Sequence, residues 1–335
     1  MSEYSITVEG GTSKRLLTAG KYCDRDIVVT ATGGGGGGDI DALIDGSLTE
    51  ISSNAAEVAD YALYNNKVLE KASLPNATKF GTYAFYGCNK LSELTAPKLA
   101  TIGSRAFYNC KALKQMDLSK ATNIGQYAFY GSGIVEATLS SFAAEIPANA
   151  FDGCHSLNTV VAPVAKGFGG NMAFSGCEAL RTAIFPEAEG VLKNSTFSMC
   201  YQLTDCQIPK CTGIEKSAMQ MCYRLVQMYL PCVTTIEASA YSSCRSLKAL
   251  VLSNANAVVT LENTNAFSSC YHILGTKNSS YNPSGLKDGY FYVPSALLED
   301  YKVATNWSTY ATQFRALEDY TVDGTVTGKL DESKI

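Results

Sequence analysis

Apolar residues return along most of this chain with a period of about 22 residues. Each period holds a large apolar residue, then a cysteine three positions later, then a leucine-like residue after three more, as in Phe85, Cys88 and Leu91. Apolar and polar positions then alternate, as over 93–96, which predicts one short strand per period with every second side chain pointing inward. A unit this small cannot bury its own apolar face. The pattern therefore predicts a solenoid of stacked units.

The register of the repeat follows from the cysteine, which we call the anchor. The anchor positions are Asn66, Cys88, Cys110, Ser132, Cys154, Cys177, Cys200, Cys222, Cys244 and Cys270, with steps of 22 or 23 residues and a last step of 26. The leucine-like positions are Leu69, Leu91, Leu113, Val135, Leu157, Leu180, Leu203, Leu225, Leu247 and Ile273. We expect parallel strands from successive turns, each ended by proline or serine, with a short helical or 3₁₀ turn over the aromatic residue on the other face.

The phrase A-F-x-x-C-x-x-L at this period resembles the BspA-like leucine-rich repeat family, which also occurs in treponemal surface proteins, over about 39–293. The chain departs from it at Asn66 and Ser132 in the anchor position and at Met219 and Tyr241 in the aromatic position. The resemblance implies a right-handed leucine-rich-repeat solenoid of mainly β or α/β class. It also implies a surface or secreted adhesion protein of bacteria, with similar repeats in phages and prophages.

The ends of the chain break the period. We predict a small β attachment module with strands over 5–9 and 26–30, a polyglycine linker, a capping helix with the first strand, the solenoid, a C-terminal cap with a helix near 295–303, and a hairpin with a polar tail. Their ranges are 1–32, 33–38, 39–54, 55–280, 281–317 and 318–335. Residues 9–29 resemble modules of tail-associated proteins of phages and prophages.

Composition excludes several classes of partner. The 335 residues carry a formal charge of −4, which gives no basic surface for nucleic acid. No apolar run is long enough to span a bilayer, and the start has neither the basic residues nor the apolar run of a secretory signal. We therefore expect no membrane insertion and no export by that route.

Twelve cysteines raise the question of metal or thiol chemistry. Eight occupy the anchor position and are expected to form a buried structural ladder: Cys88, Cys110, Cys154, Cys177, Cys200, Cys222, Cys244 and Cys270. Cys23, Cys206, Cys211 and Cys232 lie off the ladder, and their redox state stays open. The chain has no C-x-x-C pair and two histidines, in different repeats. We predict no metal, no cofactor and no enzymatic activity.

Two sets of residues are candidate binding sites. One is a pair of tyrosine stripes beside the anchor, Tyr64, Tyr86, Tyr108 and Tyr130 before it and Tyr201, Tyr223 and Tyr271 after it. The other is the outward strand face, represented by Glu93, Gln115, Asp117 and Tyr229. The tyrosines either recognise a protein or glycan or cover the core between turns. The apolar part of the strand face, which includes Tyr229, is either a site or is covered by another subunit or by the terminal segment.

These features predict a non-enzymatic binding protein. Our main hypothesis is a phage or prophage tail-associated protein that recognises a host-cell surface. Residues 1–32 would attach it to a virion protein, and several copies would raise the affinity through avidity. The alternatives are a bacterial surface adhesin of the BspA-like type and a structural spacer or scaffold. The location is then the virion or the bacterial surface. The expected partner is a protein or glycan on a host cell, and a homo-oligomer stays open.

Overall fold

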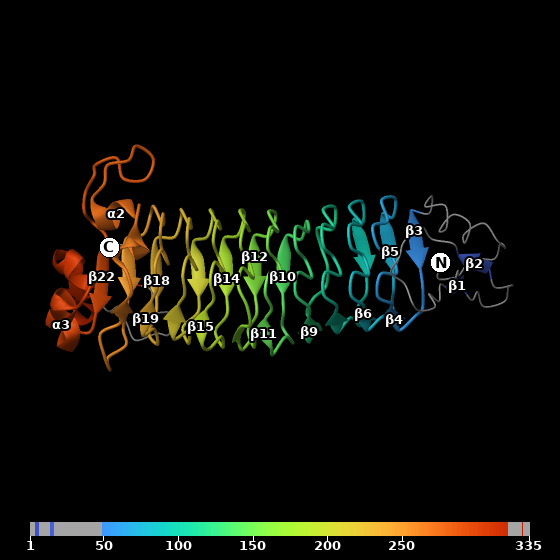
Figure 1. Cartoon of the computed structure of the whole chain (residues 1–335), viewed down its shortest axis with the longest axis horizontal. Helices are drawn as coiled ribbons and strands as arrows, with labels where there is room; N and C mark the ends of the chain where they lie inside the picture. Colours follow the sequence, from blue (N-terminus) through green and yellow to red (C-terminus); the bar gives the residue numbers. More distant parts are fainter. Residues whose placement is uncertain (1–3, 7–13, 17–48, 321–329, 331–335) are drawn as a thin grey trace. The chain divides into compact units, whose positions relative to one another are not determined.

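The computed structural model describes residues 4–6, 14–16, 49–320 and 330. The chain forms two compact units, Met1–Phe142 with Asn149–Leu157, and Ala143–Ala148 with Asn158–Ile335. We call them unit 1 and unit 2. In both, the chain winds into coils whose short strands pair in parallel with those of neighbouring coils (Figure 1). This confirms the predicted parallel-strand solenoid.

Unit 1 carries its strands on two faces of the coil. On the strand face, β3 (Glu50–Ser52), β5 (Lys71–Ser73) and β7 (Glu93–Thr95) pair in this order, and β10 (Glu136–Thr138) follows later in the chain. A second ladder joins the two-residue strands β4 (Glu57–Val58), β6 (Lys79–Phe80), β8 (Thr101–Ile102) and β9 (Asn123–Ile124). Each register pairs residues one repeat apart, such as Phe80 with Ile102.

Unit 2 repeats this arrangement. One ladder joins β12 (Thr159–Val161), β14 (Thr182–Ile184) and β16 (Asp205–Gln207), and the next joins β18 (Gln227–Tyr229), β20 (Ala249–Val251), β22 (Tyr290–Val293) and β23 (Phe314–Ala316). The short strands are β11 (Glu145–Ile146), β13 (Gly167–Phe168), β15 (Val191–Leu192), β17 (Gly213–Ile214), β19 (Thr235–Ile236) and β21 (Thr260–Leu261).

The segments that carry the aromatic residue, on the face opposite the three-residue strands, are mostly series of β-turns rather than helices. In a typical coil the amides of Tyr86 and Cys88 donate to carbonyls three residues back, while those of Phe85 and Gly87 donate to the next coil. Tyr83 and Gly87 have φ near +60° and +69°, and such residues interrupt helical geometry twice per repeat. Unit 2 has one 3₁₀ turn of this kind, η1 (Thr264–Phe267), followed by α2 (Tyr271–Leu274).

The core of unit 1 is a column of phenylalanine rings one repeat apart. The rings of Phe85 and Phe107 have centroids 5.2 Å apart, those of Phe107 and Phe129 5.3 Å, and those of Phe129 and Phe151 5.0 Å. All four side chains are fully buried. In unit 2, Phe174 and Phe197 stack in the same way at 5.5 Å. The 22-residue period thus places the phenylalanine rings of successive coils in near-parallel stacks.

Unit 2 ends in the cap that the broken period predicts. After β22 come η2 (Ser295–Leu297), α3 (Leu298–Val303), η3 (Trp307–Gln313), β23 and η4 (Leu317–Asp319). Trp307 is fully buried and its indole N–H donates to the Val259 carbonyl at 2.6 Å. Tyr301, also fully buried, accepts from the Val259 amide at 3.0 Å. The cap thus satisfies backbone groups of the last coil.

The described part of the N-terminal module contains a strand that the sequence analysis did not predict. Its first strand is β1 (Tyr4–Ile6), and it pairs antiparallel with β2 (Lys14–Leu16), a segment predicted to be rich in turns. The two strands are close in sequence, so closing the loop between them costs little chain entropy. The predicted strand over 26–30, the polyglycine linker, the capping helix and the terminal hairpin lie outside the described residues.

Candidate functional site

The anchor cysteines line the inside of each coil. All eight are fully buried and none forms a disulfide. The thiols of Cys88, Cys110, Cys154, Cys200, Cys222, Cys244 and Cys270 donate to the carbonyl of the large apolar residue one turn back, as from Cys110 to Phe85 at 3.0 Å and from Cys244 to Met219 at 3.1 Å. Burial raises the pKa of Cys88 and of Cys154 to about 12. Because a thiol attacks as its thiolate, these side chains are unsuited to nucleophilic chemistry.

At the two anchor positions without cysteine, Asn66 and Ser132 make other polar contacts. Asn66 accepts hydrogen bonds from the amides of Val68 and Leu69 through its side-chain oxygen. The Ser132 hydroxyl lies 3.4 Å from the Cys154 thiol. Across the part of the chain that the structure describes, no group of three or more histidine, cysteine or acidic residues is arranged to hold a metal ion.

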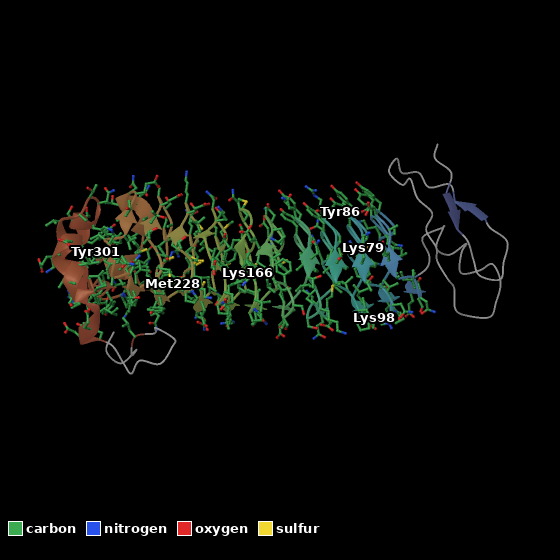
Figure 2. The ribbon with its side chains drawn as sticks, turned by 90° about the horizontal axis from the view of Figure 1, so that it is seen from below. Lys79, Tyr86, Lys98, Lys166, Met228 and Tyr301 are labelled. Atoms are coloured by element: carbon green, nitrogen blue, oxygen red, sulfur yellow. The ribbon has the colours of Figure 1, made fainter. Side chains whose placement is uncertain are left out.

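The first tyrosine stripe is a stacked column in unit 1. The ring centroids of Tyr64, Tyr86, Tyr108 and Tyr130 are separated by 4.9, 4.7 and 4.5 Å, with planes within 16° of parallel. Tyr64 is exposed and the other three are half-buried, and Figure 2 shows Tyr86 near one margin of the ribbon. Burial and the neighbouring hydroxyls raise the pKa of Tyr86 and Tyr108. These hydroxyls therefore remain protonated well into alkaline solution.

A second column, which the sequence reading missed, lies beside the first. It contains Tyr61, Tyr83, Arg105 and Tyr127, five positions before each anchor. The rings of Tyr61 and Tyr83 stack at 4.8 Å, and the Arg105 guanidinium carbon lies 4.5 Å from the Tyr127 ring centroid. Extending the register to this position would have revealed it. We call the two columns together the tyrosine surface: Tyr61, Tyr64, Tyr83, Tyr86, Arg105, Tyr108, Tyr127 and Tyr130.

The later tyrosine stripe belongs to unit 2. Tyr201 and Tyr223 stack at 4.9 Å, and Arg245 occupies the next place in the register before Tyr271. The Arg245 guanidinium carbon lies 3.9 Å from the Tyr223 ring centroid and 5.2 Å from that of Tyr281. We call Tyr201, Tyr223, Arg245 and Tyr271 the arginine column. The sequence reading missed Arg245 and Tyr281, the latter because it lies in an insertion.

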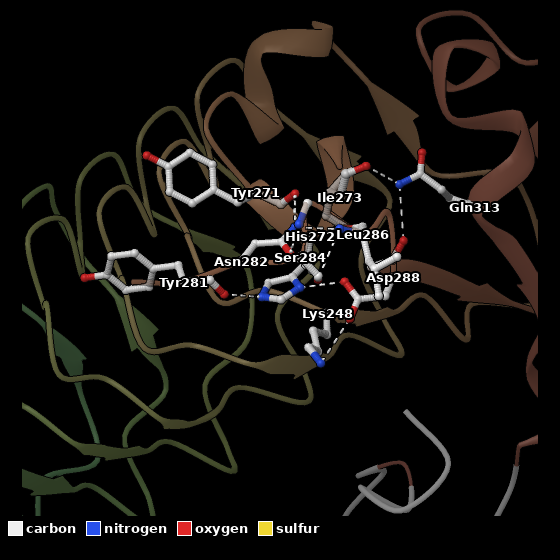
Figure 3. A network of polar contacts seen from close by, with 12 residues as sticks. Lys248, Tyr271, His272, Ile273, Tyr281, Asn282, Ser284, Leu286, Asp288 and Gln313 are labelled. Carbon is white, nitrogen blue, oxygen red and sulfur yellow. Dashed lines mark hydrogen bonds and ion pairs between the residues drawn. The ribbon is translucent and has the colours of Figure 1, made fainter. Parts of the chain in front are cut away.

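A polar network anchors this insertion, residues 275–289, against the arginine column (Figure 3). His272 is buried, with Nδ1 2.6 Å from an oxygen of Asp288 and Nε2 2.8 Å from the carbonyl of Tyr281. Lys248 pairs with the other Asp288 oxygen at 3.2 Å. Burial opposes the ionisation of Asp288, but the hydrogen bonds from His272 and Lys248 outweigh it and hold its pKa below the usual range. The network fixes the backbone that carries the Tyr281 ring.

The structure separates the predicted strand-face residues. Glu93 is exposed and lies 3.6 Å from Lys71, which also pairs with Glu50. Gln115 and Asp117 instead line an open groove of about 390 Å³. Its other lining residues are Leu94, Lys114, Met116, Leu118, Val135, Glu136 and Thr138. Ser119 donates to Asp117 through its hydroxyl and amide and thereby lowers the pKa of that carboxyl.

The groove lies where the repeat register slips. Residues 115–117 form no strand, unlike the same positions in the preceding described coils. In the next coil Ile134, fully buried, takes the place predicted for Val135, which is half-buried. The path between anchor and strand is one residue shorter there. Gly133 permits it, because a Cβ on this residue would lie 2.1 Å from the Lys111 carbonyl oxygen.

Tyr229 belongs to an apolar part of the strand face in unit 2, against which Leu330 packs. Leu330 packs with Ala249, Val251 and Tyr292, which are almost completely buried, and Tyr229 packs against this cluster. The Leu330 amide donates to the Gln227 side chain at 3.2 Å. Leu330 belongs to the terminal segment, which was one of the two covers considered from sequence.

Comparison with known proteins bears on the repeat region. A family model described as the BspA type leucine-rich repeat region matches six copies over residues 56–168 and 169–274. Similar solved structures include a leucine-rich cell surface protein from Faecalibacterium prausnitzii, with 17% identity and a TM-score of 0.39 over 66% of this chain and 76% of that one. Another is a leucine-rich repeat protein from Bacteroides ovatus, with 16% identity and a TM-score of 0.33 over 78% and 87%. A third is from T. pallidum, with 24% identity and a TM-score of 0.37 over 53% and 78%.

Two further observations complete the comparison. A search among curated proteins finds no match. None of the helices in the described segments is long and apolar enough to cross a bilayer. The family model spans well over half of the chain, and its repeats coincide with the coils whose anchor cysteines and stacked phenylalanines form the core. The chain therefore belongs to the BspA-type leucine-rich repeat family.

Proposed function

We propose that this protein is a non-enzymatic binding protein of the surface-adhesin type, and that the tyrosine surface of unit 1 contacts its partner. The observation that carries the proposal is the pair of adjoining columns with stacked rings. Tyrosine offers a large contact area, few rotamers to freeze and a hydroxyl that hydrogen-bonds, which suits recognition of a protein or glycan.

The backbone of the second column supports a role beyond folding. Tyr61, Tyr83 and Tyr127 have φ between +58° and +60°. This region costs an ordinary side chain about 1–2 kcal/mol, and ring stacking offsets part of that cost. The equivalent positions in unit 2 with the same positive φ carry methionine at Met172 and serine at Ser195, Ser217 and Ser239. This backbone therefore forms without a tyrosine, so the rings of the second column are not needed for the fold of the coil.

The family favours a bacterial surface adhesin over the phage reading. The comparisons do not support a tail-associated N-terminal module, and most of residues 1–32 lie outside the described part. Family membership and the partly exposed aromatic columns both agree with display on a cell surface. We therefore adopt the hypothesis of a bacterial surface adhesin in place of that of a phage tail-associated protein. Localisation would test this choice: antibodies should label intact cells of the source bacterium, and labelling of phage particles instead would contradict it.

Binding by the full chain tests the tyrosine surface. We expect labelled protein to bind cells, and the Tyr86→Ala, Tyr108→Ala double variant to bind at least about tenfold more weakly, a loss of about 1.4 kcal/mol. The matched Tyr→Phe double variant keeps the rings and removes the hydroxyls, so it distinguishes the contribution of the hydroxyls to binding from that of the rings. Lys98→Ala, an exposed change outside the columns, is the control. Circular dichroism should show all variants folded, and wild-type protein that binds no cell, glycan or protein refutes the proposal.

A further inference from the structure

Two separate surfaces of this protein show the same order of residues. The second column of the tyrosine surface reads Tyr61, Tyr83, Arg105, Tyr127, and the arginine column of unit 2 reads Tyr201, Tyr223, Arg245, Tyr271. In each, one arginine takes the third place. The Arg105 guanidinium lies between Tyr83 and Tyr127, at 5.5 and 4.5 Å from their ring centroids. Arg245 likewise lies against two rings, that of Tyr223 in its own column and that of Tyr281 in the insertion, which takes the place of the column member Tyr271.

Neither guanidinium has an ion-pair partner among the described residues. Both side chains are half-buried and make no hydrogen bond within that part of the chain, and Nε of Arg245 is buried without a partner. The lysines of neighbouring coils behave differently. Lys79 pairs with Glu57 at 2.9 Å, Lys193 with Glu215 at 3.2 Å and Lys210 with Glu187 at 2.6 Å, each one repeat apart. These lysines thus form ion pairs with carboxylates of the adjacent coil, whereas the two arginines form none with the residues that the structure describes.

The contact with the rings leaves the N–H groups of each guanidinium free to donate hydrogen bonds to a ligand. A cation–π contact uses the flat face of the guanidinium, whereas its N–H groups point outward in the plane. That fork matches a carboxylate or sulfate with two parallel hydrogen bonds. Tyr86 and Tyr108 lie near enough to Arg105 to feel its charge, and their hydroxyls stay protonated. The site therefore offers a cation beside hydroxyl groups that donate and accept.

We infer that Arg105 and Arg245 each form the centre of an anion-recognition subsite, and that the ligand is an acidic glycan carrying carboxylate or sulfate groups. This rests on the proposed binding function and names its ligand class. A glycan fits better than an acidic protein because the ring faces already contact one another in the columns. The rims and hydroxyls that remain suit a hydroxyl-rich ligand, whereas a protein hot spot needs an apolar anchor in a pocket.

The test uses the full chain with three immobilised polymers: heparin, which carries sulfate and carboxylate, polygalacturonate, which carries carboxylate alone, and neutral dextran. We expect binding to at least one acidic polymer, weakening with salt, and none to dextran. Arg105→Gln and Arg245→Gln should each lower the affinity about tenfold, since each removes the charge that would pair with an anionic group of the ligand. Arg→Lys at the same positions should give a smaller loss, because the charge remains without the fork.

Arg224→Gln is the matched control, because Arg224 is exposed and precedes a leucine-like position outside the columns. The inference is overturned if this change costs as much as Arg245→Gln, if both column variants bind like the wild type, if dextran binds equally well, or if polyglutamate replaces the acidic glycans as the arginine-dependent ligand. Cell binding separates the two proposals. Binding that is lost in the tyrosine variant but unaffected by both arginine variants refutes the subsites and leaves the adhesin proposal standing.

Discussion

The anchor cysteine combines small volume with a thiol that can donate a weak hydrogen bond. Each coil leaves the carbonyl of its large apolar residue pointing along the solenoid, and the thiol of the next coil meets it, as Cys222 meets Phe197 at 3.3 Å. Alanine would fit the space but leave that carbonyl without this donor. The repeated residue is therefore a packing and hydrogen-bonding element, not a reactive one.

Alkylation of the native chain follows from this burial. Cys232 is exposed and should react with iodoacetamide at pH 8, whereas Cys88 and Cys154, whose pKa burial raises to about 12, should react only after unfolding. Peptide mapping by mass spectrometry with and without urea reads each cysteine separately. Rapid labelling of either anchor in the native chain would show that the coils open easily.

Gly133 provides a second test at the residue scale. Gly133→Ala should lower the free energy of unfolding by about 1–3 kcal/mol, because the added methyl group meets the Lys111 carbonyl and the coil must shift. Gly190→Ala is the matched control: its φ is +71°, but nothing lies within 4 Å of the added atom, so only backbone strain acts there. Urea unfolding measures both. An equal or larger loss at Gly190 would contradict the steric explanation.

At the scale of elements, the strands and turns follow the 22-residue period, but the insertion at 275–289 does not. Its conformation depends on contacts between residues distant in sequence, chiefly the pairing of Asp288 with His272 and Lys248. The side chain of Asn282, almost completely buried, adds hydrogen bonds to the carbonyls of Tyr271 and Leu286. Such a loop is positioned by its polar partners rather than by strand pairing.

Asp288→Asn should loosen this insertion in a pH-dependent way. The folded-state pKa of Asp288 lies below its ordinary value of 3.8, so its contribution to stability is present at neutral pH and is lost as the pH falls through the folded pKa. We expect the variant to be less stable at pH 7 by on the order of 1 kcal/mol, with a smaller difference at pH 3, below the ordinary pKa of the carboxyl. Urea unfolding at both pH values measures it, with the exposed Asp300→Asn as control. A constant difference would exclude the carboxylate as its source.

At the scale of the whole molecule, Leu330, far along the chain, packs on the apolar strand face of unit 2. Ala249 and Val251 lie in β20, whose outward positions would meet solvent without a cover, yet both are at most 1% exposed. Exposed apolar strand faces promote association between copies. The segment that carries Leu330 therefore limits which surfaces remain for partners.

Leu330→Ser tests this cover. We expect a loss of about 1.5–3 kcal/mol in unfolding free energy and increased binding of a hydrophobic dye, because Val251 and Tyr292 become accessible. Leu286→Ser, the same change at a residue that is 61% exposed, should alter neither quantity. Light scattering would reveal association between copies. A variant as stable and as dye-silent as the control would show that Leu330 does not protect this face.

The repeat itself determined the parallel coils, the inward cysteines and phenylalanines and the first tyrosine column, because one residue at a fixed register position meets its equivalent in every coil. Tertiary structure alone decided the rest. The groove at Gln115 and Asp117 depends on a one-residue slip, and the place of Tyr281 depends on a polar network within an insertion. The burial of the face around Tyr229 depends on a segment about a hundred residues further along the chain. Periodicity predicts contacts between equivalent positions, whereas these contacts join positions that no period relates.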